Sequence, residues 1–196
     1  AMSQLDPELS HRFDQMLHRL AEAYDAIGHS SGRPYLYFVY PPEQELEVRR
    51  KVAEQMVDNG DLGFVHIDLV RLTGDSVDGQ EEKRTKLLAE SDGAKASLMR
   101  MWARRLADEI RQRIQAIPPP LRPVVVLLGT AALYPLGNPT ALMEAVAENE
   151  IRSPQTNQVV PVVLFVPGRH VPDASRTYLF LGRDDQRLSF YRGEEI

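Results

Sequence analysis

Short runs of consecutive apolar residues alternate along this chain with longer segments in which apolar residues recur every three or four positions. The runs predict buried strands and the longer segments predict helices with one buried face. The predicted strands are 35–40, 64–70, 123–128, 159–166 and 178–181. The predicted helices are 7–27, 43–58, 94–116 and one that begins at Asn138-Pro139. This alternation favours a mostly parallel sheet between two helical layers, the three-layer α/β sandwich.

The ends of these elements are predicted by prolines, glycines and helix caps. Asp6-Pro7 is expected to start the first helix, and Pro167-Gly168 is expected to stop the strand before it. A variable loop is expected over 74–93, and 190–196 reads as a polar tail. The inner side of helix 43–58 is predicted to hold Leu46, Val52, Ala53, Met56 and Val57. The longest helix should bury a row repeating every four residues, namely Leu98, Trp102, Leu106, Ile110 and Ile114.

Composition narrows the class of protein. The 196 residues fit one domain, 1–196, with Ala1 read as a cloning remnant before Met2. The absence of cysteine excludes disulfides, thiolate catalysis and iron–sulfur clusters. No apolar stretch is long enough to cross a membrane and the first residues lack a signal-peptide pattern, so we expect a cytoplasmic protein that does not bind membranes.

Motifs for common catalytic chemistries are missing from the sequence. A Walker phosphate loop ends in Gly-Lys followed by Ser or Thr, and the chain has no Gly-Lys dipeptide. It also lacks the Gly-x-Ser-x-Gly elbow of serine hydrolases. His66 and Asp68 point to one face of a predicted strand, but zinc takes three or four ligands. We therefore predict no catalytic residues, no metal site and no cofactor.

Two rigid loops stand out as candidate recognition surfaces. Pro41 to Glu45 and Thr130 to Pro139 each follow a predicted parallel strand, and ligands of open α/β sheets gather at the carboxyl ends of strands. Tyrosine and arginine are frequent interface anchors. The residues expected to be exposed contacts are Tyr40, Pro41, Pro42, Glu43, Tyr134, Pro135 and Arg192.

The long helix carries a second, weaker candidate surface. Arg100, Arg104, Arg105 and Arg111 lie on it and offer a nucleic-acid interface. With 23 basic against 28 acidic residues the net charge is −5, which argues against direct DNA binding. A solvated helix face is the simpler explanation for these arginines.

Four segments in order resemble the BrxB family: Tyr40 to Arg49, Val125 to Leu136, Val160 to Gly168, and Leu179 to Asp185 with Phe190-Tyr191-Arg192. The resemblance covers most of 35–192. The fold also looks like a P-loop NTPase-like core in which Pro41-Pro42-Glu43 replaces the phosphate loop and no nucleotide site remains.

The resemblance implies an antiviral role, as an accessory component of a bacteriophage-exclusion (BREX) phage-defence system. Such a protein is expected to be a non-catalytic adaptor that contacts a PglZ-like BREX protein, or alternatively the BREX ATPase or methyltransferase. Two other readings stay open: a nucleotide- or DNA-binding regulatory module, and an enzyme with an unrecognised site.

Overall fold

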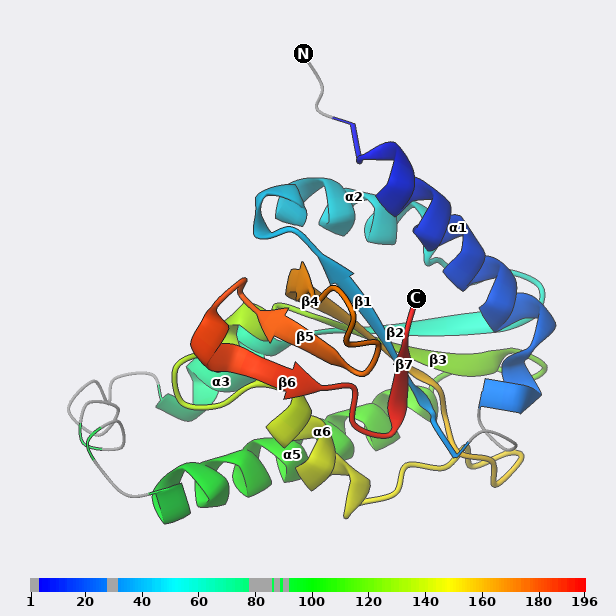
Figure 1. The fold of residues 1–196 in the computed structure, drawn as a ribbon. Helices are drawn as coiled ribbons and strands as arrows, with labels where there is room; N and C mark the ends of the chain where they lie inside the picture. The colour runs from blue at the N-terminus through cyan, green and yellow to red at the C-terminus, as the bar shows by residue number, and fades with distance from the viewer. Residues whose placement is uncertain (1–3, 28–31, 78–85, 87–88, 90–91) are drawn as a thin grey trace.

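Five parallel strands form the centre of the molecule. The computed structural model describes residues 4–27, 32–77, 86, 89 and 92–196. Across the sheet the parallel strands run in the order β2-β3-β4-β1-β7. Their bounds are β1 Tyr35–Tyr40, β2 Leu62–Asp68, β3 Arg122–Leu128, β4 Val162–His170 and β7 Gly193–Glu195. The predicted α/β class with a mostly parallel sheet is confirmed (Figure 1).

Helices cover both faces of this sheet, as the three-layer prediction required (Figure 1). One layer contains α1 (Pro7–Glu22) and α2 (Glu45–Gln55). The other contains α3 (Leu69–Val77), α5 (Asp92–Ile114) and α6 (Pro139–Ala147). Successive residues of a strand face opposite helical layers, so each buried strand contributes side chains to the hydrophobic cores on both sides of the sheet. Such a strand must therefore be apolar along its whole length.

Capping explains where several helices start. The Asp6 side chain accepts a hydrogen bond from the Glu8 amide at 2.9 Å, and Asn138 accepts one from the Ala141 amide at 2.8 Å. Each cap precedes a proline at the first helical position, where the missing amide donor costs nothing. Both predicted starts are confirmed, although α1 ends at Glu22 rather than at Ile27.

Strand β4 does not stop at Pro167-Gly168, and this prediction is wrong. The strand continues to His170 and pairs antiparallel with β5 (Thr177–Phe180), which pairs with β6 (Arg187–Ser189) across the short helix η4 (Asp184–Gln186). The Pro167 carbonyl accepts from the Leu181 amide at 2.9 Å, so the proline still contributes an acceptor to the strand although it has no amide to donate. At Gly168 a Cβ would lie 2.5 Å from the Leu179 carbonyl oxygen, which explains the glycine.

The end of the described chain is also more ordered than the polar tail we predicted. Its Phe190 is buried, and β7 pairs in parallel with β1 from Gly193 opposite Tyr35. At the predicted loop 74–93, α3 extends through Val77 and α5 begins at Asp92, so both ends of that range are helical. The rest of the range lies outside the described residues, apart from 86 and 89.

The buried face of α2 differs from the predicted one. The residues that pack on the sheet are Val48 and Val52 of the helix and Met56 just after it, a row with a spacing of four. Leu46 is 77% exposed, and Ala53 and Val57 are exposed as well. In α5, by contrast, the whole predicted row from Leu98 to Ile114 is buried.

Candidate functional site

The carboxyl edge of the sheet gathers the ends of three parallel strands. Tyr40, Asp68 and Leu128 are the last residues of β1, β2 and β3. The chain continues from them into the short helix η2 (Pro42–Gln44), into α3, and through Gly129 into the short helix η3 (Thr130–Leu133). Both loops predicted to be recognition surfaces therefore start at this edge.

Four side chains at this edge form a continuous set of polar contacts, the edge network of Tyr40, Glu45, Arg49 and Asp68. The Tyr40 hydroxyl donates to Glu45 Oε2. Arg49 Nε lies 2.7 Å from Glu45 Oε1, and Arg49 Nη1 lies 2.9 Å from Asp68 Oδ2. The network connects the end of β1 to the end of β2 by way of α2.

The protonation states in the edge network follow from burial and contact. Burial raises the pKa of Tyr40, and the hydrogen bond to Glu45 raises it further. Burial lowers the pKa of Arg49, but the hydrogen bonds to Glu45 and Asp68 together outweigh it, so the net pKa is raised. The network thus places a neutral phenol on Glu45 and a charged guanidinium between Glu45 and Asp68.

Tyr40 is not an exposed contact residue as predicted. Only 1% of its surface is accessible, because its ring faces the α1–α2 layer, where it belongs to the core. Pro41 and Pro42 are half-buried, and Glu43 is exposed, with its Oε1 4.0 Å from Arg169 Nη2. The loop therefore offers Pro41, Pro42 and Glu43 as its accessible residues.

The second predicted loop lies at the same edge but on the other layer. Tyr134 follows η3 and packs partly against the core that contains α5 and α6, while Pro135 is exposed. The guanidinium carbon of Arg183 lies 5.0 Å from the centre of the Tyr134 ring. Arg183 also pairs with Asp185 at 3.0 Å, and this hydrogen bond lowers the pKa of Asp185.

Arg192 does not belong with the other predicted contacts. It precedes Gly193, which is opposite Tyr35, the first residue of β1, and its carbonyl accepts from the Tyr35 amide at 3.4 Å. It therefore lies at the amino end of the sheet, opposite to the loops after β1 and β3. Its side chain lines a separate hollow of about 540 Å³ with Arg33 and Arg176.

Two exposed apolar residues adjoin the edge network, and the sequence analysis missed them as surface features. Leu46 lies one turn before Arg49 on α2 and is 77% exposed. Val70 is 51% exposed, and its amide donates to Asp68 Oδ1 at 3.0 Å. Both residues thus adjoin the Arg49–Asp68 ion pair. The sequence contained Leu46 as an apolar helix residue, but the predicted rotation of the helix turned it inward.

The four arginines proposed for nucleic acid do not form one patch. Arg100 and Arg104 are exposed, and Arg111 contacts Asp108 and the Asn149 carbonyl, each at 3.3 Å. Residues 100, 104 and 111 share one side of α5 because their spacings are four and seven. Arg105 points to a different side, where it lines a hollow beside β2.

His66 and Asp68 have other partners than a metal. His66 Nε2 lies 2.6 Å from the Met56 carbonyl oxygen, and Asp68 binds Arg49 and the Val70 amide. Across the described ranges, three or more His, Asp or Glu side chains nowhere gather in a metal-binding arrangement.

Every helix in the described part of the chain is too short or too polar to span a bilayer.

Comparison with known proteins found no matching family model, no matching curated protein and no matching solved structure.

Proposed function

We propose that this chain is a non-catalytic adaptor of a BREX phage-defence system, working in the cytoplasm by binding a PglZ-like protein. The docking surface is the carboxyl edge, with Leu46 and Val70 at its centre and Pro41, Pro42 and Glu43 beside them. Tyr134 and Pro135 extend it onto the other layer. The observation that carries the proposal is the exposure of Leu46, one turn before Arg49 on α2, and of Val70, whose amide binds Asp68, since Arg49 and Asp68 form one ion pair.

A surface of this kind has the composition of a protein interface. Isolated exposed apolar residues are common and need no explanation. Here each of the two is close in the chain to one partner of the Arg49–Asp68 ion pair, and Glu45 also pairs with Arg49, so apolar and charged residues alternate as at the apolar centre and polar rim of an interface. The edge network also fixes α2 relative to β2, so the surface is ordered before a partner binds and less entropy is lost on association.

The same edge has features that disfavour phosphate binding after β1. Pro41 and Pro42 lack the amide donors with which a phosphate loop cradles its ligand. Glu43 and Glu45 add negative charge at the start of α2. These residues support a binding role over nucleotide hydrolysis at this position, and the resemblance to the BrxB family supports a BREX partner.

The test is size-exclusion chromatography with light scattering on this protein mixed with the PglZ-like protein of its own system. We expect co-elution at a defined stoichiometry, and Leu46→Asp should weaken the complex at least tenfold if Leu46 is an anchor. An acidic residue in the first turn of α2 suits the helix dipole, so the variant should stay folded.

Val57→Asp is the matched control, because Val57 is 51% exposed just beyond the other end of α2. It should leave the complex unchanged. Equal affinity for Leu46→Asp and Val57→Asp would show that the docking surface is wrong. If the PglZ-like protein elutes separately at all concentrations, the same mixture is made with the BREX ATPase and the methyltransferase, and separate elution from all three refutes the adaptor role.

A further inference from the structure

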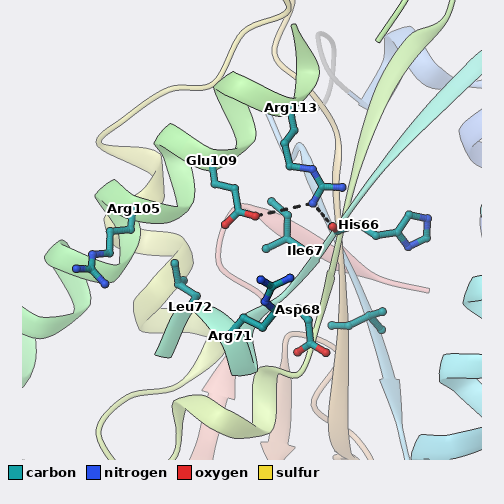
Figure 2. Close-up of a pocket in the computed structure, with 9 residues that line it drawn as sticks. His66, Ile67, Asp68, Arg71, Leu72, Arg105, Glu109 and Arg113 are labelled. Carbon is teal, nitrogen blue, oxygen red and sulfur yellow. Dashed lines mark hydrogen bonds and ion pairs between the residues drawn. The ribbon is translucent and has the colours of Figure 1, made fainter. Parts of the chain in front are cut away.

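A charged cleft lies beside β2, at the edge of the sheet, and belongs to neither predicted loop. It is enclosed by β2, the first turn of α3 and one side of α5, and has a volume of about 460 Å³ (Figure 2). Pockets of this size accept small molecules. Its lining residues are His66, Ile67, Asp68, Arg71, Leu72, Arg105, Glu109, Arg113 and Leu128.

The acidic residues of the cleft are already neutralised. Asp68 pairs with Arg49 at 2.9 Å, and Glu109 pairs with Arg113 at 3.8 Å. Arg71 and Arg105 have no ion pair or hydrogen bond with any side chain or backbone group that the structure describes. Among the described residues that line the cleft, three arginines stand against two acidic side chains, and Arg49 pairs with one of these from outside the lining, so the described lining carries an excess of positive charge.

Arg113 acts as a support in this cleft. Its guanidinium donates to the His66 carbonyl on the outer edge of β2, and Glu109 lies one turn before it on α5. Figure 2 shows the side-chain ends of Arg71, Arg113 and Glu109 gathered beside the edge strand, with that of Arg105 further out. These contacts fix α5 against β2 and leave Arg71 and Arg105 to meet a ligand.

We propose that this cleft binds the phosphoryl group of a small phosphorylated molecule. Arginine offers paired donors in a plane that matches phosphate oxygens, and a phosphoryl group carries up to two negative charges. Arg71, at the inner end of the cleft, supplies the first such donor, and Arg105, further out, adds a second positive charge along the same cleft (Figure 2). Ile67, Leu72 and Leu128 supply an apolar wall against which the rest of the molecule lies.

Isothermal titration calorimetry on the whole chain tests the site, with inorganic phosphate, pyrophosphate, AMP and ATP as separate probes. We expect saturable binding of at least one of them. Comparable affinity for pyrophosphate and the nucleotides would identify the phosphoryl group alone as the ligand, and tighter binding of the nucleotides would identify a nucleotide. Both results support the site only if Arg71→Ala and Arg105→Ala each raise the dissociation constant about tenfold, the loss expected for a charge-assisted contact.

Arg104→Ala is the matched control, because Arg104 is an exposed neighbour of Arg105 on another side of α5. It should leave the dissociation constant unchanged, and thermal melts should show that all three variants are folded. No binding at millimolar concentrations would overturn the proposal. So would binding that is insensitive to Arg71 and Arg105. Arg71 directly follows Val70 of the proposed docking surface, so the separate readouts are Arg105→Ala, on α5, for phosphate binding and Leu46→Asp, on α2, for the protein complex.

Discussion

Replacing Gly129 with alanine would place a methyl group where Asp68 now lies. Gly129 joins β3 to η3 with φ +70°, a backbone region that L-residues rarely adopt. An added Cβ would overlap Asp68 Oδ1 and lie 3.0 Å from Val70 Cγ2 and 3.2 Å from the Val70 nitrogen. The Val70 nitrogen belongs to the backbone, and Val70 Cγ2 belongs to a short, stiff β-branched side chain. The carboxylate of Asp68 is therefore the group that must move.

The expected cost has three parts. The left-handed backbone costs about 1–2 kcal/mol for alanine. Moving Asp68 removes its hydrogen bond to the Val70 amide, a contact of the helix-cap type that contributes about 1 kcal/mol. The half-exposed Arg49–Asp68 ion pair adds about 0.2–1 kcal/mol. The free energy of unfolding should therefore fall by about 2–4 kcal/mol.

Urea unfolding followed by circular dichroism measures this loss, which amounts to about 1–2 M in the midpoint for a slope near 2 kcal/mol/M. Gly32→Ala is the control, since Gly32 has φ +60° but no described atom within 4 Å of an added Cβ, and it should lose about 1–2 kcal/mol. The difference between the two should shrink when Asp68 is alanine, because the added Cβ then meets only the two Val70 atoms. A Gly129→Ala loss no larger than that of Gly32→Ala would refute this reasoning.

Three further predictions concern the cap of α6, the α5 core and the buried tyrosines. Asn138→Ala should lower the free energy of unfolding, measured in urea, by about 1 kcal/mol, because the Asn138 side chain accepts from the Ala141 amide. Asn138→Asp keeps that acceptor and should not lower it, so equal losses for the two variants would contradict the assignment of the cap. Trp102→Ala should lower the free energy of unfolding by about 3–5 kcal/mol, because the side chain is fully buried. Unfolding must be followed by circular dichroism, since the variant has lost the chain's single tryptophan and with it tryptophan fluorescence. A loss under 1 kcal/mol would be inconsistent with the burial of Trp102. Burial raises the pKa of Tyr35 from its ordinary 10.0 to about 12. The neutral form of Tyr35 therefore contributes its full stability below pH 10, and this contribution is lost as the pH rises towards 12. A free energy of unfolding that stays constant between pH 10 and pH 12 would contradict the assignment.

Elements bounded by strong local chemistry were predictable from the sequence. β1 matches its predicted bounds because six consecutive apolar or aromatic residues end at Pro41-Pro42. The buried row of α5 was predictable because Trp102 and its neighbours repeat over several turns, which fixes the rotation of a long helix. The starts of α1 and α6 followed from a cap and a proline.

The remaining errors come from contacts between distant segments. The strand through Pro167 and Gly168 persists because β5 packs against it, and no local signal shows that partner. Tyr40 is buried because the α1–α2 layer covers its ring. In the shorter helix α2, Val48, Val52 and Met56 compete with Leu46 for the core, and packing against the sheet decides between two similar rows. Arg71 and Arg105 come to line one cleft only through the tertiary fold, so the cleft had no sequence signal.

The position of β1 in the sheet has a consequence for the order of folding. β1 has two neighbours, β4 and β7, and both come from beyond residue 161. During synthesis, therefore, the first strand emerges from the ribosome long before either of the strands that pair with it. Its aromatic residues must be kept from intermolecular pairing throughout that time, since an apolar strand with both edges open invites aggregation. The parallel sheet can be completed only when residues 193–195 are available, which makes this a slow-folding topology with a late closing step.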